Sequence, residues 1–285
     1  MRSIHAFAVA ALAAVVFAPA ASAQLQLPRP SPKAGVTQTL GVTDLSLSYS
    51  RPGVKNRTIW GELVPMDKPW RTGANEATTF TTSDEITFGG QKLPAGSYSI
   101  VTIPGKDSWV VALNSDKELW AKTQYDEKKD VVRVTVKPAA AEHQESMFLG
   151  FDNLTANSTD LVLRWEKLRV AVPITADVNA KALANARAAM TTLKADDWRT
   201  PYQAASFTLA NDVAMDEGEQ WLKKSLSIQE NHTNLNLLAR WQMKVGKKKE
   251  AIATGEKAIA AGKASKETVD TSGTEKLVAE WKATK

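Results

Sequence analysis

The segment PWRTGANEATTF, residues 69–80, gathers side chains that could hold a charged or polar ligand. Arg71 could bind a carboxylate or phosphate, because a guanidinium group donates two parallel hydrogen bonds to such oxyanions. Asn75 could orient the ligand, since its amide both donates and accepts, and Glu76 could accept from a hydroxyl or an amine. Trp70 could supply a flat apolar surface or a cation–π contact. These residue types predict a ligand-binding loop.

A second basic segment, RPGVKNR at residues 51–57, precedes this one in the sequence. Its Pro52 and Gly53 predict a tight turn, which Arg51 and Arg57 would flank. If both segments lie at one end of a β-sandwich, where loops of that fold gather, their arginines would together neutralise an anion. The predicted ligand site therefore consists of Arg51, Arg57, Trp70, Arg71, Asn75 and Glu76.

The same residues also have a purely structural interpretation. Asparagine is a common turn residue, and tryptophan packs more often in a core than against a ligand. A surface pair of Arg71 and Glu76 would contribute only about 0–1 kcal/mol. Both interpretations of the segment stay open at this point.

The sequence contains no complete catalytic signature. It has no G-x-S-x-G elbow, glycine-rich phosphate loop or dinucleotide fingerprint, and the spacing of its acids selects no pair for glycoside hydrolysis. His143 lies near Ser146, but neighbours on a strand point to opposite faces, so adjacency assembles no triad. Glu76 is the one candidate that we name, as a general acid or base whose pKa burial would raise. The catalytic residue is otherwise unknown.

No metal or cofactor is expected. The chain has no cysteine, and only His143 and His232 remain once the first 23 residues are set aside. Two histidines, placed far apart in the sequence, are too few for a histidine-rich zinc site, and a thiolate site is impossible.

The first 23 residues predict a secretory signal peptide. Arg2 begins a short basic start, an apolar run extends from about Ala6 to Ala18, and Ala21-Ser22-Ala23 forms a small-x-small cleavage site. The run is shorter than the roughly 20 residues that a membrane-spanning helix needs. We expect cleavage after Ala23, a periplasmic or secreted protein, and no membrane span after cleavage.

Charge and size narrow the possible partners. Without Arg2, the chain has 35 basic and 31 acidic side chains, a net formal charge of +4. Such a mild excess, with acids interspersed, does not indicate a nucleic-acid partner. The roughly 260 remaining residues can build one or two hydrophobic cores without disulfides.

The sequence up to residue 174 has the pattern of β-strands. Leu45, Leu47 and Tyr49 alternate with polar residues, and so do the valines of 132–136. Leu161, Leu163 and Trp165 alternate in the same way, and further short runs, such as 147–151 and 168–173, are separated by turn sequences such as Gly89-Gly90. Many short strands predict an antiparallel sandwich or barrel, of which we favour the sandwich.

From residue 175 to 285 the chain is alanine-rich and the apolar period becomes three to four, which predicts amphipathic helices. Aligning residues 216–226 with 248–259 places Gly218 over Ala251 and Ser225 over Ala258, both pairs 33 residues apart. This offset is close to the 34-residue tetratricopeptide unit, in which small residues allow close helix packing. The expected fold class is therefore α+β, an antiparallel β-sandwich followed by an all-α, tetratricopeptide-like helical domain.

Four blocks in the β part resemble the DUF2911 family of exported bacterial proteins. They are YSRPGVKNRTIWGELVP (49–65), PWRTGANEATTF (69–80), FGGQKLPAGSYSIVTIPGKDSW (88–109) and LVLRWEKLRVAVPI (161–174). The resemblance covers about residues 27–174. It implies an exported β-rich domain, often followed by helical repeats, with no defined activity and no catalytic residue to carry over.

Taken together, these patterns predict a signal peptide at 1–23, a β domain at 24–174 and a helical domain at 175–285. We expect a binding or envelope-associated module, without a cofactor, that recognises a polar or anionic small molecule or peptide through loops of the β domain. One alternative is a hydrolase that uses Glu76. Another is a scaffold that binds a protein partner through its helical repeats.

Overall fold

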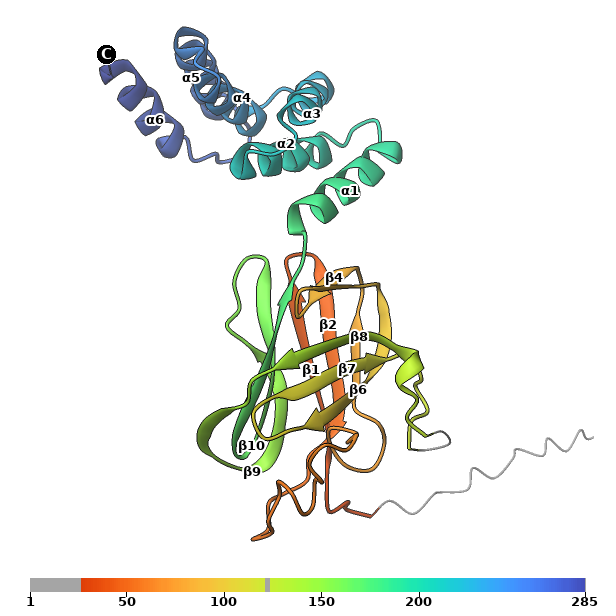
Figure 1. The fold of residues 1–285 in the computed structure, drawn as a ribbon. Helices are drawn as coiled ribbons and strands as arrows, with labels where there is room; N and C mark the ends of the chain where they lie inside the picture. The colour runs from red at the N-terminus through yellow and green to blue at the C-terminus, as the bar shows by residue number, and fades with distance from the viewer. Residues whose placement is uncertain (1–26, 121–123, 285) are drawn as a thin grey trace, which may run out of the picture.

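The computed structural model describes residues 27–120 and 124–284, so the predicted signal peptide at 1–23 lies outside the described residues. Two antiparallel sheets form the N-terminal part and helices form the C-terminal part (Figure 1). The α+β fold class predicted from the sequence is confirmed.

The first sheet has six strands within the described residues, in the order β1-β2-β3-β6-β7-β8. The second has four, in the order β5-β4-β10-β9. All paired neighbours are antiparallel. The strand bounds are β1 Lys33–Leu40, β2 Thr43–Ser50, β3 Thr79–Thr82, β4 Ile86–Phe88, β5 Gln91–Leu93, β6 Gly96–Pro104, β7 Trp109–Asn114, β8 Asp130–Val136, β9 Ala139–Asp152 and β10 Ser158–Thr175.

The core lies between the two sheets. The period-two pattern of β2 places Leu45 and Leu47 inside, where they are 1% and 3% exposed. Phe80 of β3 meets Phe88 of β4 across the layers, with ring centroids 5.9 Å apart. One continuous hydrophobic cluster joins residues of both sheets, which makes the β part a sandwich.

The strand pattern differs from the sequence prediction at three places. β1 was not predicted, because its residues alternate between exposed and half-buried rather than between polar and apolar. β9 begins at Ala139, whereas only 147–151 was expected to be a strand. β10 is one strand of 18 residues rather than two, and Glu166 lies within it at a positive φ of 55°, beside two shifts of register. A bulge thus interrupts the alternation without ending the strand.

Six helices follow in the described part of the chain. Their bounds are α1 Val178–Thr191, α2 Arg199–Asn211, α3 Met215–Ile228, α4 His232–Lys244, α5 Lys248–Lys263 and α6 Ser272–Ala283. None of the described helices is long and apolar enough to cross a membrane.

Two helix pairs repeat along the helical part. α2 begins at 199 and α4 at 232, and α3 begins at 215 and α5 at 248, so both offsets are 33 residues. Gly218 lies so close to α2 that a Cβ there would be 1.9 Å from Oγ1 of Thr208. The equivalent Ala251 is fully buried. Small residues at this position let the two helices of each pair approach closely.

The helices adjoin one end of the sandwich. Asp177 accepts a hydrogen bond from the Ala180 amide and so caps α1, two residues after β10 ends. A Cβ on Gly41 would lie 2.4 Å from a methyl group of Val178, and Lys181 forms an ion pair with Asp84. In Figure 1 the orange loops that follow β2 lie at the opposite end. The predicted ligand site is therefore remote from the helices.

Candidate functional site

All six predicted site residues lie in the segment 51–78, which connects β2 to β3. This segment is irregular, but it is attached to both sheets. The amide of Val54 donates to the Glu145 carbonyl of β9 at 2.8 Å, and the amide of Trp70 donates to the Thr102 carbonyl of β6 at 2.8 Å. Because both layers hold the segment, its side chains can have defined positions.

Four indoles pack together beneath the surface of the segment, and we call them the tryptophan cluster. Trp60 and Trp70 belong to the segment, Trp109 to β7 and Trp165 to β10. Trp70 is stacked on Trp165 with ring centroids 5.8 Å apart and planes inclined by 17°. Trp60 meets Trp70, Trp109 and Trp165 edge-on, with centroid distances of 6.0, 5.0 and 5.7 Å. Such stacked and edge-to-face contacts stabilise beyond the area that they bury, so the floor beneath the segment is rigid.

A cavity of about 300 Å³ opens above this floor. We call it the loop-end cavity. It is lined by Ser31, Pro52, Arg57, Leu63, Val64, Trp70, Arg71, Gly73, Ala74, Asn75 and Trp165. Four of the six predicted site residues, Arg57, Trp70, Arg71 and Asn75, are therefore brought together around one concavity.

The two arginines of the loop-end cavity are held by backbone carbonyls. Arg57 donates from Nε to the Val54 carbonyl at 3.1 Å and from Nη2 to the Gly53 carbonyl at 2.6 Å. Arg71 donates from Nη1 to the Asn75 carbonyl at 2.7 Å. In the part of the chain that the structure describes, neither guanidinium forms an ion pair with a carboxylate. Their orientation is fixed while their charges remain unmatched.

Asn75 takes the left-handed backbone conformation, with a φ of 59°, which asparagine tolerates better than most residues. Its Nδ2 donates to the Ser31 carbonyl at 3.1 Å and to the Ser50 hydroxyl at 3.2 Å. The amide therefore ties the segment to the chain on either side of β1 and β2, and its role is at least partly structural.

Arg51 does not line the loop-end cavity, because its Nε donates to the Met147 carbonyl of β9 at 2.8 Å. Glu76 lines a neighbouring cavity of about 370 Å³ instead. Its carboxylate accepts from Nη1 of Arg29 at 2.5 Å, and both side chains are more than half exposed. The hydrogen bond from Arg29 lowers the pKa of the Glu76 carboxyl below its usual range. The pairing of Glu76 with Arg71 that the sequence had suggested is thus replaced by one with Arg29.

A second loop, between β7 and β8, contacts Arg71 through Trp120. Trp120 of this loop lies under the Arg71 guanidinium, 5.8 Å from ring centroid to Cζ, in a cation–π contact. Leu119 is fully buried against Val101 and Ala112, which anchors the loop on the outer face of the first sheet.

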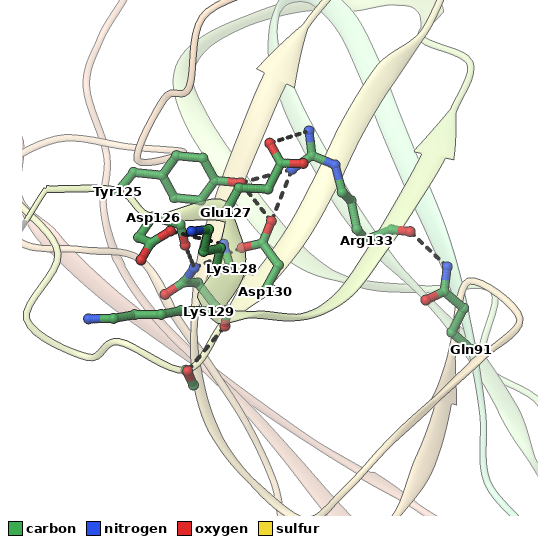
Figure 2. A network of polar contacts seen from close by, with 10 residues as sticks. Gln91, Tyr125, Asp126, Glu127, Lys128, Lys129, Asp130 and Arg133 are labelled. Atoms are coloured by element: carbon green, nitrogen blue, oxygen red, sulfur yellow. Dashed lines mark hydrogen bonds and ion pairs between the residues drawn. The ribbon is translucent and has the colours of Figure 1, made fainter.

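Figure 2 shows the polar network that closes this second loop. Arg133 donates from Nη1 to the Tyr125 hydroxyl at 2.8 Å and to Oδ2 of Asp130 at 3.0 Å. The Tyr125 hydroxyl donates to the same Asp130 oxygen at 2.6 Å, and Asn114 donates to Oδ1 at 2.8 Å. Burial, followed by the hydrogen bond to Asp130, raises the pKa of Tyr125 well above its usual range. We call these four residues the Arg133 network.

The sequence did not single out Trp165 as a site residue. It appeared only as the inward member of an alternating strand, and it is indeed 1% exposed. Its indole N–H is buried without a hydrogen-bond partner in the described structure, as is that of Trp60. A buried donor without an acceptor is uncommon and costs free energy, so these two groups require an explanation.

Neither catalytic geometry nor a metal centre emerges from the other candidates. Nε2 of His143 lies 3.4 Å from a Glu145 oxygen, and the backbone of Ser146 forms a β-bridge with Gly53. Across the described residues, no group of three or more histidine, cysteine, aspartate or glutamate side chains could hold a metal ion.

The class of the molecule follows from these features: a two-sheet β domain with a loop-built cavity at one end, joined to helices at the other. The model of the DUF2911 family, whose members are described as proteins of unknown function, matches residues 31–174. The match covers half of the chain, and the chain belongs to this family. No curated protein and no solved structure matches the chain significantly.

Proposed function

We propose that the β domain binds a small anionic or polar molecule in the loop-end cavity, and that the protein is an exported binding module rather than an enzyme. The observation that carries the proposal is the pair of guanidinium groups, Arg57 and Arg71, that line one cavity with unmatched charge. A guanidinium group in a partly apolar cavity is incompletely hydrated, and an anion that binds there restores the favourable electrostatic interactions that water would otherwise supply.

The surroundings of the two arginines support binding. Trp70 and Trp165 provide a flat apolar wall, and the backbone bonds of both arginines keep their remaining donors in place. A site that is fixed before the ligand arrives loses less conformational entropy on binding. The signal peptide expected at 1–23 supports the proposal that this binding occurs in the periplasm or outside the cell.

Hydrolysis by Glu76 is the less favoured alternative. A general acid needs a carboxyl pKa raised towards neutrality, whereas the hydrogen bond from Arg29 lowers the pKa of Glu76. The carboxylate also belongs to the neighbouring cavity and is more than half exposed. We therefore assign it a surface ion pair and no catalytic role.

A second candidate function concerns the helices, which we propose to be degenerate tetratricopeptide-like repeats. The 33-residue offset of the two helix pairs and the close approach at Gly218 support this interpretation. A cavity of about 630 Å³, lined by residues such as Trp198, Arg199 and His232, lies among the helix ends. It is the place where a protein or peptide partner would be sought.

Isothermal titration calorimetry on the mature chain tests the β-domain proposal. The probes are acetate, benzoate, glucuronate, inorganic phosphate and a short acidic peptide. We expect at least one of them to bind, and its Kd to rise tenfold or more in Arg57→Ala and in Arg71→Ala. A tenfold change corresponds to about 1.4 kcal/mol of binding free energy.

The matched control is Arg240→Ala. Arg240 is an exposed arginine of α4, and its removal alters the net charge by the same amount. We expect this variant to bind like the unaltered protein. Failure of all five probes to bind, or equal affinity in Arg71→Ala and the unaltered protein, would contradict the proposal.

A further inference from the structure

The loop-end cavity has an excess of hydrogen-bond donors. Arg57 retains Nη1 and Arg71 retains Nε and Nη2 without a partner in the described structure. Trp165 also lines the cavity, and its buried indole N–H lacks an acceptor in the described structure. All of these groups can donate, and none of them can accept.

Four backbone carbonyls near these donors already accept a hydrogen bond, so the lining side chains offer mainly the Asn75 amide oxygen and the Ser31 hydroxyl as acceptors. The carbonyl of Gly73, a lining residue, accepts from Nε1 of Trp70 at 3.2 Å. The carbonyls of Val54 and Gly53 accept from Arg57, and that of Asn75 accepts from Arg71. A ligand that brings its own hydroxyl donors would therefore find few acceptors and would leave those donors unsatisfied.

Apart from Ser31 and Asn75, much of the remaining wall of the cavity is apolar. The apolar part consists of the stacked pair Trp70 and Trp165, together with Leu63, Val64 and Pro52. Flat indole faces and aliphatic side chains favour a flat apolar body. A volume of about 300 Å³ stands at the small end of ligand sites and suits a molecule of one or two rings.

From this inventory we infer that the ligand class of the loop-end cavity is a small aromatic carboxylate, and that the site discriminates against sugars and other polyols. The carboxylate supplies acceptors to Arg57 and Arg71, and the ring packs against Trp70 and Trp165. The inference rests on the proposed function, since it names the chemistry that the same cavity would take.

Calorimetry with four probes tests the inferred preference for aromatic carboxylates separately from the proposed binding of anions. Benzoate and naphthoate have the inferred chemistry, glucuronate has the charge without the apolar body, and benzyl alcohol has the body without the charge. We expect benzoate or naphthoate to bind at least tenfold more tightly than glucuronate and than benzyl alcohol. The preference for an aromatic acid should disappear in Arg71→Gln.

Replacement of one indole tests the contribution of Trp165 to the wall. Trp165→Phe keeps an aromatic ring there but removes the indole N–H and makes the ring system smaller, so we expect a several-fold loss of benzoate affinity. The matched control is Trp241→Phe, because Trp241 is also buried but belongs to the helical core. Far-ultraviolet circular dichroism verifies that both variants are folded.

The outcomes are distinguishable. If glucuronate binds as tightly as benzoate and both depend on Arg71, the inference is overturned while the proposed function stands. If none of these four probes binds, the inference is overturned; the proposed function falls with it only if acetate, phosphate and the acidic peptide also fail to bind. If benzoate binds equally well to Trp165→Phe and to the unaltered protein, the contribution assigned to the Trp165 indole is overturned.

Discussion

Two arginines of the β domain, Arg71 and Arg133, have similar aromatic contacts but differ in whether a carboxylate neutralises their charge. Arg71 belongs to the segment that connects β2 to β3 and lies over the Trp120 ring, whereas Arg133 belongs to β8 and donates to the Tyr125 hydroxyl. Arg133 faces the carboxylates of Asp130 and Glu127 at 3.0 and 3.5 Å. Among the described residues, Arg71 donates to one backbone carbonyl and lies over one indole ring, and it faces no carboxylate.

A structural arginine can be distinguished from a binding one by whether a carboxylate of the protein neutralises its charge. In the Arg133 network every polar group satisfies another, so the loop is closed and nothing is left for a ligand. At the loop-end cavity the same residue type is oriented but uncompensated. Four substitutions test this difference between the two arginines.

The largest effect is expected for Asp130→Asn. The side chain of Asp130 is 5% exposed and accepts from Asn114, Tyr125 and Arg133. Its loss leaves Arg133 without its closest carboxylate, which should lower the free energy of unfolding by about 2–3 kcal/mol. Urea denaturation followed by circular dichroism measures it. A change below about 0.5 kcal/mol would mean that the network does not hold the loop.

Tyr125→Phe should lower the free energy of unfolding by less, about 1 kcal/mol at neutral pH, because it removes one hydroxyl from the Arg133 network. The pKa of Tyr125 is raised in the folded state, so its contribution is present below the ordinary tyrosine pKa of about 10 and is lost as the pH rises further. The difference in stability between the unaltered protein and Tyr125→Phe should therefore shrink above about pH 10. A constant difference across that range would contradict the assignment.

Arg71→Ala should affect stability less than either change. Its single backbone hydrogen bond and exposed cation–π contact suggest a loss under about 1 kcal/mol in urea denaturation. Ligand affinity should respond much more strongly than stability. A stability loss as large as that of Asp130→Asn would erase the distinction between the two arginines.

The smallest change in the free energy of unfolding is expected for Arg29→Ala, which removes the exposed partner of Glu76. The folded-state pKa of Glu76 is lowered, so the pair with Arg29 stabilises the protein above the ordinary glutamate pKa, and this contribution is lost as the pH falls through the lowered pKa. In Arg29→Ala the pKa of Glu76 should return towards its usual range, as nuclear magnetic resonance titration of the carboxyl group would detect. An unchanged pKa would show that Arg29 is not its cause.

Sequence reasoning found the part of the site that is local in the chain. Arg71 and Asn75 are close in sequence, and the turn chemistry around Gly73 indicated a loop. It could not find Trp165, because a buried strand tryptophan looks the same whether or not it borders a cavity. Arg51 was expected to belong to the site, yet its direction is set by the Met147 carbonyl of a distant strand.

The fold shows the same division between local and distant information. Alternation of apolar residues predicted β2, and the apolar period of three to four predicted helices after residue 175. The edge strand β1 was not predicted, because its pairing with β2 stabilises it and its own residues show no apolar alternation. The pairing of Glu76 with Arg29 joins residues 47 positions apart and has no signature in either segment.

The tryptophan cluster has an optical consequence. Transitions of stacked indoles couple when their rings are close and held at a fixed angle, as Trp70 and Trp165 are. The near-ultraviolet circular dichroism of the protein should therefore contain a strong contribution from one end of the β domain. No tryptophan pair of this kind occurs among the described helices, where the ring contact is between Trp198 and Tyr202. The protein thus contains a built-in chromophore that reports on the cavity floor without any label.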